Sequence, residues 1–308
     1  MSKKILLLYF TPKQKTELKM CEAAFKAIFR KFRKSALFSY MQIDTSLTCR
    51  DSFKEILFNE INRHDAVLIN GGNSTGYEEE IFTKEILCLL ATENHINGKV
   101  ICYPPSYYTA ENENRDICEI AKTYSEGLRA AASLSLHFAK ERKQNLTICT
   151  RKGFATDKNL FDELQKLCTK AVHISTEHLS LDEMVFLCMR AIPSFDTVVS
   201  TEQTAKIILM HLAALAKVPT GYLLLHTKGE RAYSRQSFPH EEMSNAPISS
   251  ILMAFSAILE NEFKMKSASH WLRKSVATAF ETHAYVPRDE FLNKVISEAE
   301  KPMRNSKR

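Results

Sequence analysis

Glycine is scarce in this chain. Only 8 of the 308 residues are glycine, well under the roughly 7% that is usual. A nucleotide-binding loop needs glycine wherever the backbone must approach a phosphate group closely. The deficit argues against an elaborate phosphate cradle. The stretch from Gly71 to Gly76 is rich in glycine but lacks the Walker spacing and its lysine.

Other absences narrow the class of protein. The 8 cysteines are dispersed without a CxxC pair, which favours a reducing cytoplasm over a disulfide framework. The opening MSKKILLLYF is too short an apolar run to span a membrane, and it predicts a first strand, not a signal peptide. The net charge is +6, but no basic stripe is interleaved with aromatics. We therefore expect no membrane span and no nucleic-acid partner.

Strand and helix patterns alternate along the chain, which predicts an α/β fold with parallel strands. Apolar residues at 44% and charged residues at 25% are typical of a soluble globular protein with a large core. Strands are expected at 5–9, 38–43, 65–70, 99–103, 146–150, 172–174, 197–199 and 222–226. Helices are expected at 15–34, 52–62, 81–92, 117–142, 159–169, 181–191, after residue 200, and at 247–261, 267–282 and 288–300. Polar loops are expected at 107–115 and 227–245.

One stretch, FDTVVSTEQTAKIILMHL from Phe195 to Leu212, combines a buried strand with a capped, largely buried helix. It resembles the strand and helix that hold the metal in the isopropylmalate and isocitrate dehydrogenase family, the metal-dependent β-decarboxylating dehydrogenases. Three further segments resemble that family in the same order. They are DAVLINGG at 65–72, YSEGLRAAASLSLHFAKERKQNLT at 124–147, and the helix at 247–259.

The resemblance implies an isopropylmalate dehydrogenase-like fold, a doubly wound α/β sheet with two interlocked domains. The larger, discontinuous domain would comprise residues 1–100 and 248–308. The central domain, 101–247, would carry the dimer contact. The resemblance also implies a homodimer, or a heteromer with a related subunit, in which each site takes residues from both chains.

The metal site of the family is altered in this sequence. Two family aspartates, four residues apart on one helix face, correspond to Lys206 and Met210. An ammonium group cannot ligate a cation, and a thioether is a poor ligand for a hard one. Asp182 matches the third family aspartate, although a helix N-terminal charge that complements the dipole is the favoured interpretation. We therefore expect neither Mg²⁺ nor Mn²⁺.

The remaining family positions are also altered. Lys152 matches the catalytic lysine of the family, but Phe154 replaces the asparagine on the nicotinamide side. A solvent-facing lysine is an equal interpretation of Lys152. The family arginine motif corresponds best to a segment with tyrosine at the arginine position, Tyr103. The N-terminal glycine turn is replaced by Tyr9 to Pro12.

The adenosine loop of the family corresponds to residues 239–247, in which His240 and Asn245 are the cofactor-binding candidates. His240 could also be an ordinary loop histidine. If a cofactor is retained, the resemblance implies NAD or NADP.

These losses lead to two main hypotheses. The first is a divergent member of this family without the metal-dependent oxidative decarboxylation, acting as a non-catalytic subunit or small-ligand binder. The second is an active NAD(P)-dependent oxidoreductase on a 2-hydroxy acid, with a rearranged site that could work without a metal. In that site Lys152, Asp182 and Lys206 would act, Lys206 as a fixed positive charge facing an anionic ligand. A third hypothesis, an interaction protein, rests on the basic tail from Lys301 to Arg308.

Overall fold

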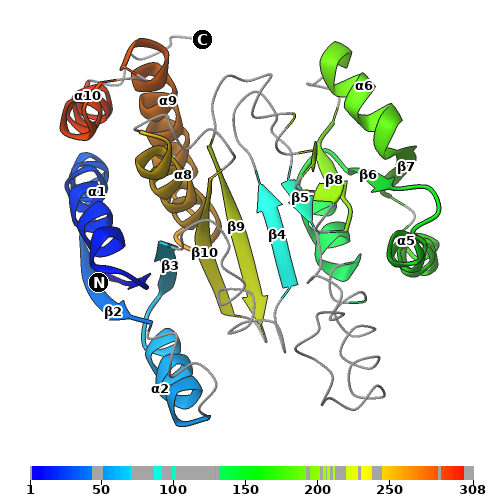
Figure 1. Ribbon diagram of the computed structural model, residues 1–308, viewed down its shortest axis with the longest axis horizontal. Coiled ribbons are helices and arrows are strands. Elements are labelled where there is room, and N and C mark those ends of the chain that lie inside the picture. Colours follow the sequence, from blue (N-terminus) through cyan, green and yellow to red (C-terminus); the bar gives the residue numbers. More distant parts are fainter. Residues whose placement is uncertain are drawn as a thin grey trace. The chain divides into compact units, whose positions relative to one another are not determined.

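The computed structural model divides the chain into two compact units (Figure 1). The first comprises Met1–Asn73 with Ala232–Arg308, and the second comprises Ser74–Arg231. The domain boundaries expected from the sequence, at 1–100 with 248–308 and at 101–247, stay a prediction. The structure describes residues 2–43, 51–70, 87–91, 99–101, 129, 132–171, 173–191, 195–201, 204–205, 207–208, 211, 220–227, 230–237, 245–283 and 286–301.

The first unit is a parallel sheet with helices. Its strand order is β2-β1-β3-β10, and all three pairings are parallel. The strands are β1 Lys3–Tyr9, β2 Ala36–Gln42, β3 Ala66–Asn70 and β10 Glu230–Ser237, most of which falls in this unit. The helices are α1 Pro12–Lys31, α2 Asp51–Asn62, α8 Ala246–Asn261, α9 Lys266–His283 and α10 Arg288–Glu300.

The core of the first unit lies between its sheet and its helices. The residues of β3 are all buried, as are the last five of β1. The ring of Phe25 on α1 stacks on Phe255 of α8, with centroids 3.8 Å apart, and Phe29 meets the same ring edge-on. Helices α1, α8, α9 and α10 pack against one another. This aromatic contact joins the N-terminal helix to the C-terminal helices and explains why the unit is discontinuous in sequence.

The second unit contains a mixed sheet in the order β9-β4-β5-β8-β6-β7. Strand β4 pairs antiparallel with β9 and β5, whereas the pairings of β5, β8, β6 and β7 are parallel. The strands are β4 Leu87–Ala91, β5 Lys99–Ile101, β6 Asn145–Thr150, β7 Ser175–Ser180, β8 Thr197–Val199 and β9 Thr220–Thr227. The helices are 132–141, α5 Ala155–Cys168, α6 Leu181–Ala191 and the described part of the helix after β8.

Helix α6 illustrates how an amphipathic sequence places its two faces. It follows β7 directly and packs against β6 and β7. Met184 and Cys188, four residues apart, are buried, while Phe186 and Met189 are exposed. The buried face meets the sheet near Cys149 of β6, whose thiol is also buried.

Most sequence predictions of elements are confirmed, but three are wrong. The helix expected at 81–92 is in part a strand, β4. The strand expected at 172–174 instead begins at Ser175, and the loop expected at 227–245 contains β10. Short apolar runs do not distinguish helix from strand by periodicity, and β7 and β10 are too polar to have been recognised. The loop expected at 107–115 lies outside the described residues.

The α/β class is confirmed, whereas the doubly wound arrangement and interlocked domains stay predictions. Among the helices of the described residues, none has both the length and the apolar character needed to cross a bilayer.

Candidate functional site

The carboxyl ends of three parallel strands of the second unit bring two of the expected site residues to one edge of the sheet. Strand β6 lies between β7 and β8, with Thr150 paired to Ser180 and Ile148 to Val199. Ligands of open α/β sheets bind beyond the carboxyl ends of the strands. This edge is therefore the candidate site of the second unit.

Lys152 and Asp182 both follow strands at this edge. Lys152 lies two residues beyond β6 and is exposed, and Asp182 is the second residue of α6 and is also exposed. Lys206 and Met210 lie outside the described residues. The roles assigned to Lys152, Asp182 and Lys206 from the sequence stay predictions.

A buried carboxylate, that of Asp157, is bonded to residues that follow two of these strands. Asp157, in the first turn of α5, is 0% exposed. Its Oδ2 accepts a hydrogen bond from the Arg151 backbone N–H at 2.6 Å, and the Arg151 guanidinium Nε lies 3.5 Å away. The hydroxyl of Thr201 donates to Oδ1 at 2.8 Å, and that of Thr204 donates to Oδ2 at 3.1 Å. Both carboxylate oxygens are thus bonded to groups of the protein itself.

We refer to Asp157, Arg151, Thr201 and Thr204 as the Asp157 network. It connects the residue after β6 with the segment after β8, because Thr201 follows that strand and Thr204 lies in the helix after it. The Arg151 guanidinium also lies over the ring of Phe154, 3.9 Å from its centroid. A buried carboxylate is stabilised when a cation and several hydrogen bonds compensate its lost hydration. At this part of the sheet edge, the polar groups of the network therefore bind one another.

The start of α6 is fixed by a capping box. The backbone N–H and the hydroxyl of Ser180 donate to Oε2 of Glu183 at 2.8 and 2.7 Å, and the Glu183 N–H donates back to the Ser180 hydroxyl at 3.3 Å. These bonds from the Ser180 backbone and side chain lower the pKa of Glu183 below its ordinary value. Glu183 is committed to the cap, whereas the neighbouring Asp182 faces solvent.

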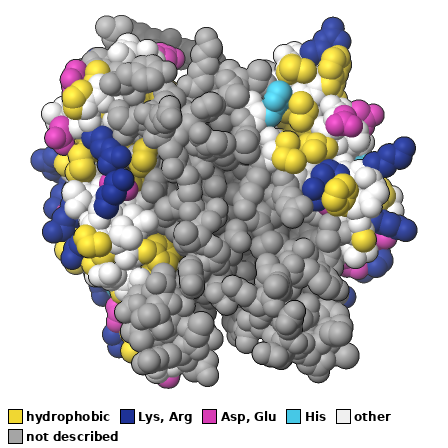
Figure 2. Space-filling view, in the orientation of Figure 1, with side chains coloured by type: hydrophobic (Ala, Val, Ile, Leu, Met, Phe, Trp, Pro, Cys, Tyr) yellow, Lys and Arg dark blue, Asp and Glu magenta, His cyan; other side chains and the backbone are white. Residues whose placement is uncertain are grey.

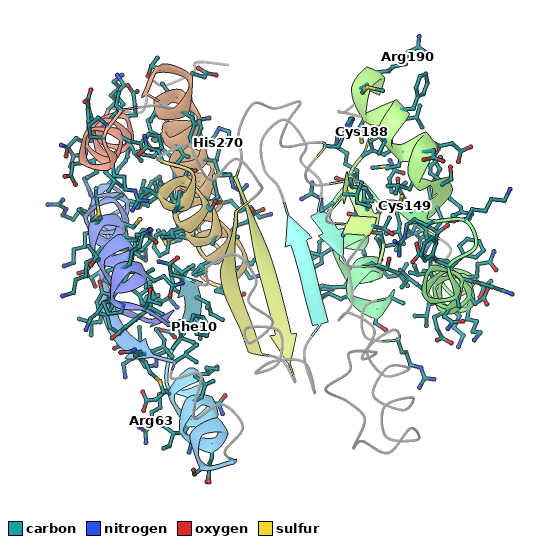
Figure 3. The ribbon with its side chains drawn as sticks, viewed as in Figure 1. Phe10, Arg63, Cys149, Cys188, Arg190 and His270 are labelled. Carbon is teal, nitrogen blue, oxygen red and sulfur yellow. The ribbon has the colours of Figure 1, made fainter. Side chains whose placement is uncertain are left out.

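The thiols behind this edge are not poised as nucleophiles. Figure 3 labels Cys149 on β6 and Cys188 on α6. Burial raises the pKa of Cys149 to about 12, with a contribution from the charge of Asp157. Burial also raises the pKa of Cys188 to about 11. Because the thiolate is the reactive form of cysteine, both thiols are inert at neutral pH.

The first unit has a second buried carboxylate, near the carboxyl ends of β1 and β3, where Tyr9 pairs with Asn70. Glu17 of α1 is 2% exposed and accepts hydrogen bonds from the Asn70 amide at 3.1 Å and from the Arg288 guanidinium at 3.0 Å. The Asn70 amide also donates to the Gln14 carbonyl at 2.8 Å. We refer to Glu17, Asn70 and Arg288 as the Glu17 cluster.

The N-terminus of α1 does not fit a bound phosphate. Its N-cap is Thr11, with Pro12 at the first turn. The backbone N–H groups of Phe10 and Thr11 donate to the side-chain oxygen of Gln14 at 2.8 and 2.9 Å. These donors are therefore engaged within the chain, at the place where the family resemblance implied a glycine turn.

Of the two cofactor-binding candidates, only Asn245 lies among the described residues. Asn245 is buried at the N-cap position of α8, and its amide donates to the Val286 carbonyl at 2.8 Å. This bond joins the start of α8 to the segment before α10. His240 lies outside the described residues. Cofactor binding by His240 and Asn245 stays a prediction.

The described residues do not fit a resident divalent metal. No group of three His, Cys, Asp or Glu side chains that could hold one occurs among them. The buried carboxylate at the candidate edge, Asp157, already accepts bonds from a guanidinium, a backbone N–H and two hydroxyls. A carboxylate that binds a cation must turn its lone pairs toward it.

Sequence analysis missed the Asp157 network and the Glu17 cluster. No spacing or motif marks Asp157, Glu17 or Arg288. The partners of Glu17 lie 53 and 271 residues away, so only the folded chain brings them together.

The fold of the chain is similar to that of several solved structures. An isocitrate dehydrogenase from Methylococcus capsulatus matches with a TM-score of 0.69 at 10% identity, over 98% of this chain and 100% of that one. The chain has the isocitrate dehydrogenase fold. The TT0538 protein from Thermus thermophilus matches with a TM-score of 0.69 at 11% identity, over 99% of this chain and 69% of that one.

A third structure with the same fold comes from a large assembly. It is a chain in the cryo-EM structure of the Euglena gracilis mitochondrial ATP synthase peripheral stalk, with a TM-score of 0.68 at 12% identity. The match covers 96% of this chain and 99% of that one. No family model and no curated protein sequence matches the chain.

Proposed function

We propose that this protein has the isocitrate dehydrogenase fold without the metal-dependent oxidative decarboxylation, and that it acts as a non-catalytic subunit of an assembly. The observation that carries the proposal is the Asp157 network. At the sheet edge where the fold would bind its substrate, the buried carboxylate is bonded to Arg151, Thr201 and Thr204 and contributes to stability. A site for an anionic substrate and a cation would need these groups to face the ligand.

The sequence supports the same proposal independently. Lys206 and Met210 stand where the family has two aspartate ligands. A lysine ammonium repels a divalent cation, and the methionine thioether binds hard cations weakly. The reaction needs the metal to polarise the hydroxyl and the developing enolate. Loss of two ligands would therefore remove turnover even if the rest of the site were kept.

The role as a subunit is supported by the range of proteins with this fold. One neighbour is a chain of an ATP synthase peripheral stalk, and another is an isocitrate dehydrogenase. The fold is thus found both in an enzyme and in a large assembly. The proposed state of this chain is a homodimer, or a heteromer with a related subunit, and a bound small molecule is compatible with either.

The test combines a turnover assay with metal-dependent cofactor binding. The full chain is incubated with a panel of 2-hydroxy dicarboxylic acids, NAD or NADP, and Mg²⁺ or Mn²⁺, while reduced nicotinamide is followed by absorbance. Isothermal titration of NAD and NADP is then compared with and without Mn²⁺. We expect no turnover and no effect of the metal. Tight, metal-dependent cofactor binding or sustained turnover would overturn the proposal.

A second candidate is an active, metal-free oxidoreductase on a 2-hydroxy acid. It is favoured by the exposed Lys152 and Asp182 after neighbouring strands of one sheet edge. In this version Lys206 supplies a fixed positive charge in place of the metal. Activity that survives EDTA, is lost in Lys206→Ala and is kept in the control Lys158→Ala would support it. Lys158 is a suitable control because it is an exposed lysine on α5.

A further inference from the structure

Helix α1 of the first unit carries an exposed line of basic side chains that the proposed function leaves without a role. The exposed residues recur every three or four positions, so they lie in one line along the helix. We refer to them as the α1 line, which consists of Thr16, Lys19, Ala23, Lys26 and Arg30. Three of the five are basic and none is acidic. Figure 2 shows Lys and Arg side chains along its left margin, where Figure 1 places α1.

The helix dipole explains only part of this charge. Cations near the carboxyl end of a helix are favourable, and Arg30 and Lys31 lie in the last turn of α1. The first turn, however, has no acidic residue, and Lys13 within it is exposed. A cation there opposes the dipole, and Lys19 follows before the helix has reached its middle. The exposed face of α1 is therefore basic even where folding of the helix does not favour it.

The carboxylates beside the α1 line leave much of its charge exposed. Lys26 forms an ion pair with Glu22 of the preceding turn, yet its side chain stays 57% exposed. The guanidinium of Arg30 lies 4.0 Å from a carboxylate oxygen of Glu300, and both side chains are exposed. Lys19 has no ion-pair partner among the residues that the structure describes. Because exposed pairs of this kind are weak, an external anion can compete for the cations of the line.

The form of the α1 line favours an acidic helix over other anions. The line extends over roughly 21 Å, and acidic residues at the same spacing on a second helix would face its cations along the whole length. Ala23, in the middle, has a small side chain that lets a second helix approach closely. Single-stranded nucleic acid is bound with aromatic side chains, and membrane-surface helices carry large apolar ones. The α1 line contains neither kind of residue.

We propose that the α1 line is the docking surface for an acidic helix of a partner protein. Glutamate or aspartate residues of that helix face Lys19, Lys26 and Arg30, and they take the place of the weak contact between Arg30 and Glu300. Opposite charges at matched positions fix the partner's register and exclude basic helices. The inference rests on the proposed function for the role as a subunit, and it names the chemistry of the partner.

The first experiment measures binding of a designed peptide to the full chain at low ionic strength. The probe is an alanine-rich helical peptide of about 21 residues, with glutamates alternately three and four positions apart. The control peptide has the same composition with glutamates five positions apart, which points them in different directions around the helix. Fluorescence anisotropy should show the probe binding roughly tenfold more tightly than the control. Added salt should weaken this binding.

The second experiment assigns the binding to the α1 line. Lys19→Glu and Lys26→Glu should each weaken binding of the probe by roughly fivefold or more. Lys158→Glu is the matched control, because Lys158 is an exposed lysine on helix α5 of the second unit, and it should leave binding unchanged. A triple variant that also carries Arg30→Glu should instead bind a peptide with lysine at the probe's glutamate positions. Circular dichroism spectra identical to that of the parent chain establish that each variant is folded.

Failure of this inference can be distinguished from failure of the proposed function. No binding of the probe, equal binding of probe and control, or equal weakening by Lys19→Glu and Lys158→Glu would each overturn the acidic-helix partner. Tighter binding of single-stranded nucleic acid or of anionic lipid vesicles, lost in the triple variant, would overturn it as well. Turnover on a 2-hydroxy acid by a chain that binds the probe through the α1 line would overturn the proposed function and keep the docking surface.

Discussion

Each compact unit has a buried carboxylate near the carboxyl ends of its parallel strands. The two carboxylates differ in how far along the sequence their arginine partners lie. In the second unit Asp157 binds Arg151, only 6 residues away. In the first unit Glu17 binds Arg288, 271 residues away. The Asp157 network joins the start of α5 to the segments that follow β6 and β8. The Glu17 cluster joins the N-terminal helix α1 to the C-terminal helix α10. Buried carboxylates here hold segments together, and breaking them should destabilise different parts of each unit.

The largest effect is expected for Asp157→Ala. It leaves the Arg151 guanidinium, which is only 16% exposed, without its carboxylate, and breaking a buried ion pair costs about 3–5 kcal/mol. Urea unfolding measures the loss, and amide exchange should localise it to β6 and the segment after β8.

Asp289→Ala is the matched control for this prediction. Asp289 also lies in the first turn of a helix, α10, but it is exposed. Its substitution should change the free energy of unfolding by less than about 0.5 kcal/mol. Equal losses in the two variants would contradict a special role for the buried network.

A smaller effect is expected for Glu17→Gln in the first unit. Glutamine can still accept from the Asn70 amide but loses the charge that faces Arg288. Because the Arg288 side chain is 31% exposed, water can solvate it, and the loss should be about 1–2 kcal/mol. A double-mutant cycle with Arg288→Met measures the pair by thermal unfolding. A coupling energy near zero would mean that Glu17 does not stabilise the unit through Arg288.

Helices and strands with a strong apolar pattern could be predicted from the sequence, whereas polar strands could not. The helices α6 and α10 and the strand β8 were predicted with the bounds that the structure has, because their apolar periodicity is strong. Strands β7 and β10 were missed or displaced because STEHLS and ERAYSRQS are polar. Their strand structure depends on pairing with β6 and β3, which no local pattern encodes.

The candidate site was predicted only in part. The resemblance named Lys152 and Asp182, whose roles stay predictions, and topology places both after neighbouring strands at one sheet edge. The Asp157 network could not be predicted, since Thr201 and Thr204 approach Asp157 from 44 and 47 residues away in sequence. A buried polar network depends on tertiary geometry, and single residues of common types carry no signal for it.

Alkaline pH should weaken the second unit through its buried thiols. The pKa of Cys149 is raised to about 12 and that of Cys188 to about 11, from 9.0. Above about pH 9 the unfolded chain loses these protons while the folded chain keeps them, so stability falls as pH rises toward 11 and 12. Urea unfolding of the parent chain and of Cys149→Ala, at about pH 8 and about pH 10, measures this. An equal alkaline loss in both proteins would assign it to other groups.

The smallest effect concerns the capping boxes, which differ between the units in one titratable group. Helix α1 is capped by Thr11 and Gln14, and α6 by Ser180 and Glu183. Substitution of a capping serine or threonine by alanine costs about 1 kcal/mol, so Thr11→Ala and Ser180→Ala should be similar near neutral pH.

Acid should separate the two caps. The folded pKa of Glu183 is lowered by its bonds from Ser180, so the stability that these bonds add is present above the ordinary pKa and is lost as pH falls through the folded value. Gln14 does not titrate. Between about pH 6 and about pH 3, the cost of Ser180→Ala should therefore shrink while that of Thr11→Ala stays constant. Amide exchange in the first turns of α6 and α1 measures both costs in one experiment. A parallel decline in the two helices would show that acid acts on the whole fold and not on the Glu183 cap.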